Sequence, residues 1–232
     1  MCVIAVSPKG QQFPTVNQIK NCVDSNPDGF AMSWNEDGEV KTYKTMSHKG
    51  IMRHYRKFIE THDPETTGLL FHARIATHGS KNIKNCHCWV SDGLAFAHNG
   101  ILSVANRGDM TDSETFFQDI FLPIYRTTGW DGAKRAIDAC IGTSKFAFIN
   151  GNGEVVGFGN YKCKDGNYFS NDSYMSYEEK YPSYYGSRVV SRWNANHGTT
   201  YYDSKDDDLY EESMSYYKKY YPELFADESD EM

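Results

Sequence analysis

A cysteine directly behind the initiator methionine constrains this chain more than any other feature. Cys2 opens the short apolar run Cys2-Val3-Ile4-Ala5-Val6, which is typical of a buried β-strand. Methionine aminopeptidase removes an initiator methionine when the next residue is small, as cysteine is. Removal would leave one residue with both a thiol and an α-amino group, whose unperturbed pKa of about 8 suits a general base. The alternative interpretation is a small apolar residue that opens a buried strand and does no chemistry.

The length and composition indicate one sizeable globular domain without a membrane segment. The 232 residues include 15% aromatic side chains, enough to build a core. Apolar runs stay well below the roughly 20 residues needed to cross a bilayer, and the N-terminus lacks the pattern of a signal peptide. The six cysteines lack the spacing of a disulfide framework, so we expect reduced thiols and a cytoplasmic location. The net charge of −7 argues against nucleic-acid binding.

Charge and tyrosine content divide the chain near residues 173–177. Residues 1–174 carry equal numbers of acidic and basic side chains, whereas residues 175–232 carry the whole net charge and 11 of the 17 tyrosines. We therefore predict a main domain over residues 1–174 and an acidic, tyrosine-rich extension over residues 175–232. In the simplest interpretation the extension packs on the main domain; a docking surface for a partner protein is the alternative.

Hydrophobic periodicity predicts strands and helices in a mixed order. A capping signal at Thr15 and Gln18 begins a helix that stops before the Asn26-Pro27-Asp28-Gly29 turn. Further helices are expected over residues 49–61, 113–127 and 131–141, and strands over residues 2–7, 30–34, 39–45, 69–77, 93–98, 145–150, 154–159 and 168–169. Strands, then helices, then more strands indicate α+β layers, with sheet packed on sheet and helices outside.

Three further stretches contain polar residues suited to binding or catalysis. Arg74 follows an apolar run and needs an anionic partner, either a substrate carboxylate or an internal Asp or Glu. Asn99 and Gly100 end a strand, where a side-chain amide and a backbone N–H form either an oxyanion hole or an ordinary β-turn. Asp112 lies in Thr111-Asp112-Ser113-Glu114, a typical helix N-cap whose carboxylate could also meet a ligand's ammonium group.

In this order and at these spacings, the stretches resemble the class II glutamine amidotransferases, whose glutaminase domains use an N-terminal nucleophile. The matching segments are Cys2, Arg-Ile-Ala-Thr-His-Gly at 74–79, His-Asn-Gly at 98–100 and Thr-Asp-Ser-Glu at 111–114. Weaker matches are residues 26–31, 85–88 and 168–172. The resemblance covers residues 2–174 and stops at the change in composition.

The resemblance implies a four-layer αββα Ntn-hydrolase sandwich with two stacked, mostly antiparallel sheets. It also implies that Cys2 attacks the side-chain amide of L-glutamine with its own α-amino group as base, while Asn99 and the Gly100 N–H hold the oxyanion. The resulting thioester would be hydrolysed to glutamate, and ammonia would be released. No cofactor is implied, and no metal is expected, because Cys86-His87-Cys88 lacks the second ligand pair of a zinc site.

The resemblance assigns the remaining site residues to substrate binding. Arg74 would bind the α-carboxylate of glutamine and Asp112 its α-ammonium group, while Thr77 and His78 would line the pocket. Ile75 stands where many members of the family carry Trp. A zwitterionic amino acid needs one fixed cation, one fixed anion, a nucleophile and an oxyanion site, and the sequence offers a residue for each.

The destination of the ammonia leaves three hypotheses open. The family usually couples this domain to a synthase that consumes ammonia, and residues 175–232 are too few for such a domain, so we expect a separate ammonia-accepting enzyme as partner. Whether the chain forms oligomers is left open. The first alternative is an amide or γ-glutamyl hydrolase of the same fold that acts on another small molecule. The second is a catalytically inactive scaffold or binding protein.

Overall fold

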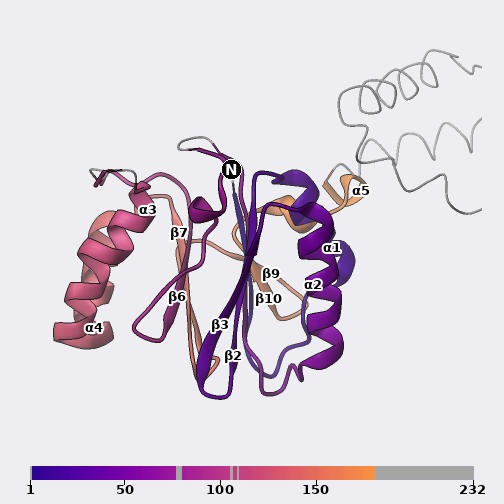
Figure 1. The fold of residues 1–232 in the computed structure, drawn as a ribbon, viewed down its shortest axis with the longest axis horizontal. Helices are drawn as coiled ribbons and strands as arrows, with labels where there is room; N and C mark the ends of the chain where they lie inside the picture. The colour runs from indigo at the N-terminus through magenta and orange to yellow at the C-terminus, as the bar shows by residue number, and fades with distance from the viewer. Residues whose placement is uncertain (1, 77–79, 105–106, 109, 181–232) are drawn as a thin grey trace, which may run out of the picture. The chain divides into compact units, whose positions relative to one another are not determined.

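Two antiparallel sheets lie face to face between two layers of helices (Figure 1). The computed structural model describes residues 2–76, 80–104, 107–108 and 110–180. These residues belong to one compact unit that extends to Lys180. Residues 77–79 and 181–232 lie outside the described residues, so the predicted boundary after residue 174 and the role of the extension stay predictions.

The first sheet has six strands and the second has four, and all strand pairs in the described chain are antiparallel. The six-stranded sheet has the order β3 (Glu39–Thr45), β2 (Phe30–Glu36), β4 (Leu69–Ala73), β1 (Val3–Ser7), β10 (Asn167–Phe169), β9 (Lys162–Lys164). The four-stranded sheet has the order β5 (Trp89–Ser91), β6 (Leu94–Asn99), β7 (Lys145–Asn150), β8 (Val155–Phe158). The N-terminal strand β1 therefore lies inside the larger sheet, with β4 on one side and β10 on the other.

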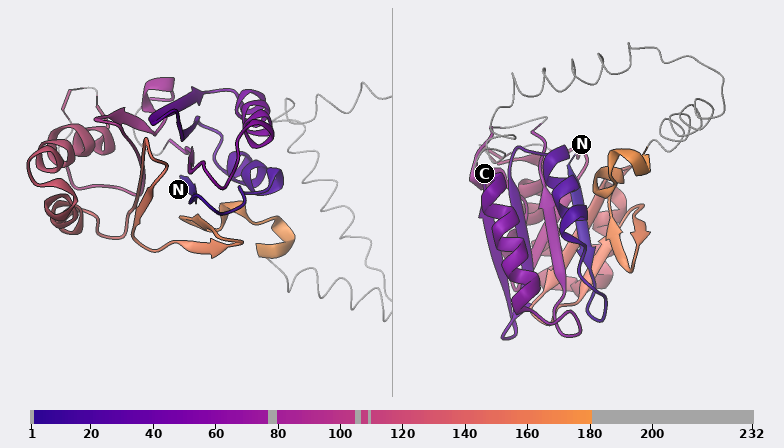
Figure 2. Two further views of the ribbon diagram at one scale, coloured as in Figure 1. Left: turned by 90° about the horizontal axis from the view of Figure 1, so that it is seen from below. Right: turned by 90° about the vertical axis from the view of Figure 1, so that its right-hand side faces the viewer.

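Helices cover the outer face of each sheet, which completes the four layers (Figures 1 and 2). The helices on the six-stranded sheet are α1 (Val16–Ser25) and α2 (His48–Thr61). Those on the four-stranded sheet are α3 (Asp112–Thr115), the π-helical turn η2 (Phe116–Phe121) and α4 (Leu122–Cys140). Three short elements complete the chain: η1 (Ile83–Asn85), η3 (Asp172–Tyr174) and α5 (Tyr177–Lys180). The α+β, four-layer architecture expected from the sequence is confirmed.

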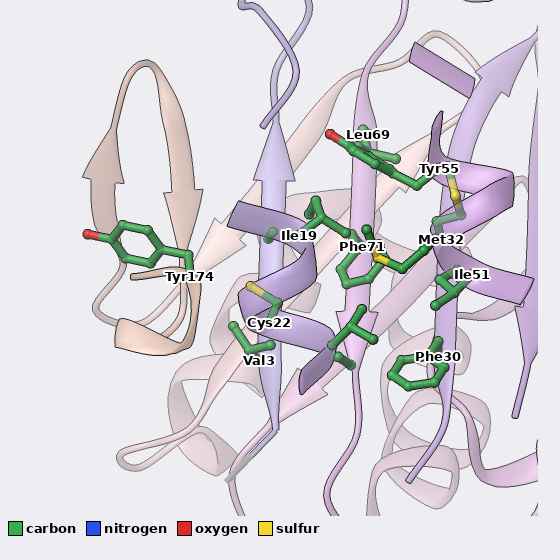
Figure 3. Packing of buried hydrophobic residues seen from close by; sticks show 14 of the residues in the cluster. Val3, Ile19, Cys22, Phe30, Met32, Ile51, Tyr55, Leu69, Phe71 and Tyr174 are labelled. Carbon is green, nitrogen blue, oxygen red and sulfur yellow. The ribbon is translucent and has the colours of Figure 1, made fainter. Parts of the chain in front are cut away.

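Three hydrophobic clusters hold the layers together. The first joins the six-stranded sheet to α1 and α2 (Figure 3) and includes Val3, Ile19, Phe30, Met32, Tyr55 and Phe71. The second joins the four-stranded sheet to η2 and α4 and is rich in phenylalanine, with Phe96, Phe116, Phe117, Phe121, Phe146 and Phe148. The third lies between the sheets and consists largely of small side chains, among them Ala31, Ala95, Ala97, Ala147, Cys86 and Cys88. Small residues at this interface let the two sheets approach closely.

The strand β1 is buried on both faces, which explains its uninterrupted apolar sequence. Val3 and Ala5 pack in the cluster beneath the helices, whereas Ile4 and Val6 pack in the cluster between the sheets. This alternation follows from the two-residue period of a strand. Cys2 directly precedes this buried strand, so the packing of β1 fixes the position of Cys2.

Most elements agree with the sequence expectations. The differences include two short strands that were not expected and one strand that ends early. The capping box at Thr15 and Gln18 is present, and the break expected between two helices is a bend in α4 at Gly129, where φ is 64°. The strands β5 and β9, of three residues each, were not predicted. The strand expected over residues 69–77 ends at Ala73, and beyond it the Ile75 N–H donates to the Cys2 sulfur. No helix within the described residues is long and apolar enough to cross a membrane.

Candidate active site

The thiol of Cys2 lies against the main chain of Ile75. The Cys2 thiol donates to the Ile75 carbonyl oxygen, with Sγ and O 3.5 Å apart, and Sγ accepts from the Ile75 N–H at 3.4 Å. In the pairing of β1 with β4, Val3 lies opposite Ala73, so Cys2 lies beside the chain that follows Ala73. The strand pairing therefore brings Cys2 next to the segment that contains Arg74, as the sequence led us to expect for two parts of one site.

The surroundings of Cys2 favour a protonated thiol. Burial raises the pKa of the Cys2 thiol above its ordinary value, although the hydrogen bond from the Ile75 backbone and the positive charge of Arg74 act in the opposite direction. The two polar effects are smaller than the effect of burial. A thiol with a raised pKa needs a base to remove its proton before it can act as a nucleophile at neutral pH.

Arg74 is buried, with its polar head held by backbone groups. Its side chain Nη1 donates to the carbonyl oxygen of Ser80 at 3.0 Å, and the same carbonyl accepts from Asn85 Nδ2 at 2.9 Å. Its backbone N–H donates to the Gly29 carbonyl, and its carbonyl accepts from the Asp28 N–H, both at 2.8 Å. These contacts fix a buried positive charge beside the Cys2 segment, where it can meet an anionic group of a ligand.

Asp28 supports this segment in a way that the sequence did not predict. One carboxylate oxygen of Asp28 accepts from the Ala76 N–H at 2.9 Å, and the other lies 2.5 Å from Lys81 Nζ. Burial raises the pKa of Asp28, but the contacts with Lys81 and Ala76 outweigh it and lower the pKa below its ordinary value. Asp28 thus joins the chain on both sides of residues 77–79. The candidate pocket residues Thr77 and His78 fall in that gap, outside the described residues.

Asn99 and Gly100 lie at the end of β6, where the second sheet meets β1. Asn99 is buried, and its Nδ2 donates to Ser170 Oγ at 2.8 Å. The same hydroxyl oxygen accepts from the Ile4 N–H at 2.8 Å, so one serine joins the end of β6 to the start of β1. Gly100 has a φ of 149°, and a Cβ atom there would lie only 2.1 Å from Ser144 Oγ. The chain can make this turn because residue 100 has no side chain.

Asn171, the residue after Ser170, holds the backbone of Cys2. Asn171 Nδ2 donates to the Cys2 carbonyl oxygen at 2.7 Å. Ser170 and Asn171 follow β10, which pairs with β1. The sequence marked this segment as a weak family match but assigned no role to either side chain. The signal that was available is two adjacent hydrogen-bonding residues directly after a buried strand.

Asp112 is tied to the chain that follows Gly100. Thr111 is the helix N-cap, and its side chain accepts from the Glu114 N–H. The Asp112 carboxylate accepts from the Leu102 N–H at 2.8 Å and from the Ser113 N–H at 2.7 Å. Within the described residues these bonds place Asp112 at the Gly100 turn, and none joins it directly to Cys2. The position of Asp112 is compatible with both interpretations, a role at the start of the helix and a contact with a ligand.

Three buried histidines, His72, His87 and His98, lie close together. The rings of His72 and His87 are stacked with centroids 4.1 Å apart, and those of His87 and His98 are nearly parallel with centroids 6.2 Å apart. Burial lowers the pKa of His72 to about 3 and that of His98 to about 4, although the Asp112 charge raises the latter. Burial also lowers the pKa of His87 well below its ordinary value, with the neighbouring histidines adding to the effect. All three imidazoles are therefore neutral at pH 7.

The cysteines are free thiols. Cys86 and Cys88 are buried, and the Cys86 thiol lies 3.6 Å from the Met46 sulfur. Within the described ranges no group of three or more His, Cys, Asp or Glu side chains is arranged to hold a metal ion. The Cys86-His87-Cys88 stretch instead contributes its thiols to the packing between the sheets.

Comparisons with known proteins concern the fold. No protein-family model matches the chain, and no curated protein matches it in sequence. Glutamine phosphoribosylpyrophosphate amidotransferase from B. subtilis, solved with ADP and GMP, aligns with 75% of this chain and 42% of its own, with a TM-score of 0.52 and 15% identity. An enzyme described as the allosteric regulatory enzyme of purine biosynthesis aligns with 75% of this chain and 43% of its own, with a TM-score of 0.50 and 15% identity.

A third solved structure is a glutamine aminotransferase class-II domain protein from Silicibacter pomeroyi. It aligns with 73% of this chain and 87% of its own, with a TM-score of 0.43 and 15% identity. This chain spans less than half the length of the B. subtilis enzyme, of which 42% is covered. The described part of the chain therefore has the αββα sandwich fold found in a solved glutamine amidotransferase.

Proposed function

We propose that this protein hydrolyses the side-chain amide of glutamine to glutamate and ammonia through a thioester on Cys2. The observation that carries the proposal is the position of the Cys2 thiol, which lies on the Ile75 backbone, next to the buried charge of Arg74. The strand that carries Cys2 is joined by Ser170 to Asn99. The fold shared with a solved glutamine amidotransferase supports the same class of reaction.

The first chemical step is attack by sulfur on the amide carbon of glutamine. Removal of Met1 leaves the α-amino group of Cys2 free to take the thiol proton. A base is needed for this step because burial raises the pKa of the thiol. The sulfur–carbon bond then forms, and the carbonyl oxygen becomes an oxyanion. Asn99 Nδ2 and the Gly100 N–H donate to that oxyanion. Collapse of the intermediate returns the proton to the leaving nitrogen, and ammonia departs.

The second step is hydrolysis of the thioester. The α-amino group of Cys2 accepts a proton from water as the oxygen attacks the acyl carbon, and the same donors hold the second oxyanion. The carbon–sulfur bond breaks, glutamate leaves, and the thiol is regenerated. Atoms and charge balance without a cofactor.

Substrate binding uses the opposite charges of Arg74 and Asp112 in this proposal. The Arg74 guanidinium binds the α-carboxylate of glutamine, since its planar fork suits two-point contact with a carboxylate. Asp112 binds the α-ammonium group, with its position set by the Leu102 N–H. Thr77 and His78 complete the pocket in this proposal.

The ammonia passes to a separate acceptor enzyme in this proposal. The alignment with the B. subtilis amidotransferase leaves more than half of that chain without a counterpart here, since it covers 42% of it. Co-purification of a protein whose glutamine-dependent product also forms with free ammonia would support this step.

Glutamate and ammonia production by the processed protein tests the function. We expect wild-type protein, with removal of Met1 verified by intact mass, to release the two products in equal amounts. The Cys2→Ala variant should fall to background, whereas Cys163→Ala, which removes an exposed thiol on β9, should keep wild-type turnover. Turnover that persists in Cys2→Ala, or its absence in processed wild-type protein, contradicts the proposal. Hydrolysis of another small amide but not of glutamine would favour the first alternative function.

A further inference from the structure

The hydroxyl of Ser170 accepts two hydrogen bonds that come from different sheets. The Ile4 N–H on β1 and the Asn99 side-chain Nδ2 at the end of β6 each donate to Ser170 Oγ at 2.8 Å. The Ser170 N–H in turn donates to the Ile4 carbonyl at 2.9 Å, so the serine backbone is fixed on β1. Both Ser170 and Asn99 are buried. The Asn99 amide is therefore held in a fixed position relative to the strand that carries the candidate nucleophile.

The neighbouring residue strengthens this geometric link. Asn171 Nδ2 donates to the Cys2 carbonyl at 2.7 Å, so two consecutive residues hold the Cys2 backbone and the Asn99 side chain. An oxyanion donor works only when it is already aimed at the oxygen that becomes charged, because reorganisation during the reaction weakens its effect. A dipeptide that touches both the nucleophile and the donor is well placed to supply that alignment.

The hydrogen-bonding pattern of Asn99 shows why its amide needs such a contact. Its Nδ2 carries two hydrogens, of which one is directed to Ser170 Oγ and the other remains for a ligand oxygen. Its Oδ1 is buried with no hydrogen-bond partner among the described residues. Rotation of the amide by half a turn would place Oδ1, an acceptor, where the oxyanion needs a donor. The Ser170 contact is the side-chain hydrogen bond that the structure gives Asn99 to hold its orientation.

We propose that Ser170 is a positioning residue for glutamine hydrolysis, which aims the Asn99 amide at the oxyanion by accepting one of its two Nδ2 hydrogens. This inference rests on the proposed function. In this proposal Ser170 makes no contact with the substrate and changes the rate through Asn99, while its bond from the Ile4 N–H fixes the hydroxyl on β1. Its loss should therefore reduce the rate of the chemical step and leave glutamine binding nearly unchanged.

A double-mutant cycle between Ser170 and Asn99 tests the proposal. We expect Ser170→Ala to lower kcat about 10-fold or more with KM within about 2-fold, and Ser170→Thr to recover most of the rate because it keeps the hydroxyl. In the Asn99→Ala background, Ser170→Ala should change kcat by less than about 2-fold, since the side chain through which it acts is gone. Equal proportional losses in both backgrounds would overturn the role.

Two controls separate positioning from simple loss of structure. Ser7→Ala removes a buried serine hydroxyl from β1 that has no hydrogen-bond partner among the described residues, and it should leave kcat unchanged. Alkylation of Cys2 by iodoacetamide forms no oxyanion, so its rate should be the same in Ser170→Ala and wild type. A fall in the alkylation rate that matches the fall in kcat would show a disordered site and contradict positioning.

The failure of this inference can be told apart from failure of the proposed function. If processed wild-type protein does not hydrolyse glutamine, the proposed function falls, and the role of Ser170 in it falls as well. If wild type hydrolyses glutamine but Ser170→Ala keeps full kcat, or its loss adds to that of Asn99→Ala, only the role of Ser170 is overturned.

Discussion

At the scale of single residues, the candidate site depends on main-chain geometry as much as on side chains. The Cys2 sulfur hydrogen-bonds with the N–H and the carbonyl of Ile75. These two hydrogen bonds use main-chain groups, which every residue type at position 75 would supply except proline, which lacks the N–H. Gly100 also depends on main-chain geometry, because a Cβ atom at this residue would collide with Ser144.

A methyl group at residue 100 should be poorly tolerated. The Cβ of Gly100→Ala would lie 2.1 Å from Ser144 Oγ and 2.9 Å from Ser144 Cα, at a φ of 149°. We expect the free energy of unfolding to fall by about 3 kcal/mol, from backbone strain and the clash together. Urea unfolding measures this change. The matched control is Gly93→Ala, where φ is 71° and nothing lies within 4 Å, so that strain alone should cost about 1 kcal/mol. Equal losses in the two variants would contradict the close approach.

At the scale of elements, facing strands bring together ionisable groups that are far apart in sequence. His72 lies on β4 and His98 on β6, and the His87 ring lies near both, with its centroid 4.1 Å from that of His72 and 6.2 Å from that of His98. His87 Nδ1 accepts from the His98 N–H at 3.2 Å, so that nitrogen carries no proton. Neither ring nitrogen of His72 has a hydrogen-bond partner among the described residues. These neutral rings are costly to protonate where they lie.

The histidine stack should make the fold sensitive to acid. Burial lowers the pKa of His72 to about 3 in the folded state, so below the unfolded value of about 6.5 the unfolded chain binds protons that the folded chain cannot. The free energy of unfolding should therefore fall as the pH falls from about 6.5 to 4, by up to about 1.4 kcal/mol per pH unit for each such histidine. Urea unfolding between pH 7.5 and pH 4.5 measures this slope.

The variant His72→Leu isolates this effect. Leucine cannot take up a proton, so the slope below pH 6.5 should be shallower than in wild type. At pH 7.5 the variant should be as stable as wild type or more stable, because the ring nitrogens it removes are buried without partners in the described chain. An unchanged pH slope would show that His72 does not contribute to acid sensitivity.

The sequence predicted elements best where the signal is local. The Thr15 capping box, the bend at Gly129 and the two hairpins over residues 30–45 and 145–159 all carry their information within a few residues. The three-residue strands β5 and β9 are too short for a periodic pattern and become strands only by pairing with β6 and β10. Long-range pairing of this kind cannot be derived from propensity.

At the scale of the whole molecule, stacking of the two sheets assembles the site. The six-stranded sheet contributes Cys2 and the four-stranded sheet contributes Asn99, and Ser170 joins them through contacts 166 and 71 residues apart in sequence. The resemblance of these segments to a known family predicted which residues share a site, and that assignment stays a prediction. The resemblance could not indicate Ser170, Asn171 or Asp28, whose roles depend on contacts between distant segments.

Covalent labelling of the processed protein by a diazo-ketone analogue of glutamine tests the central claim most directly. The Cys2 thiolate should displace nitrogen from the protonated analogue and form a stable thioether, which intact mass and peptide mapping would locate. We predict one adduct per chain, on Cys2 alone, formed more slowly when glutamine is present. Labelling of Cys163 or another thiol while Cys2 stays unmodified, or labelling that glutamine does not slow, would contradict the assignment of Cys2 as the nucleophile of a glutamine site.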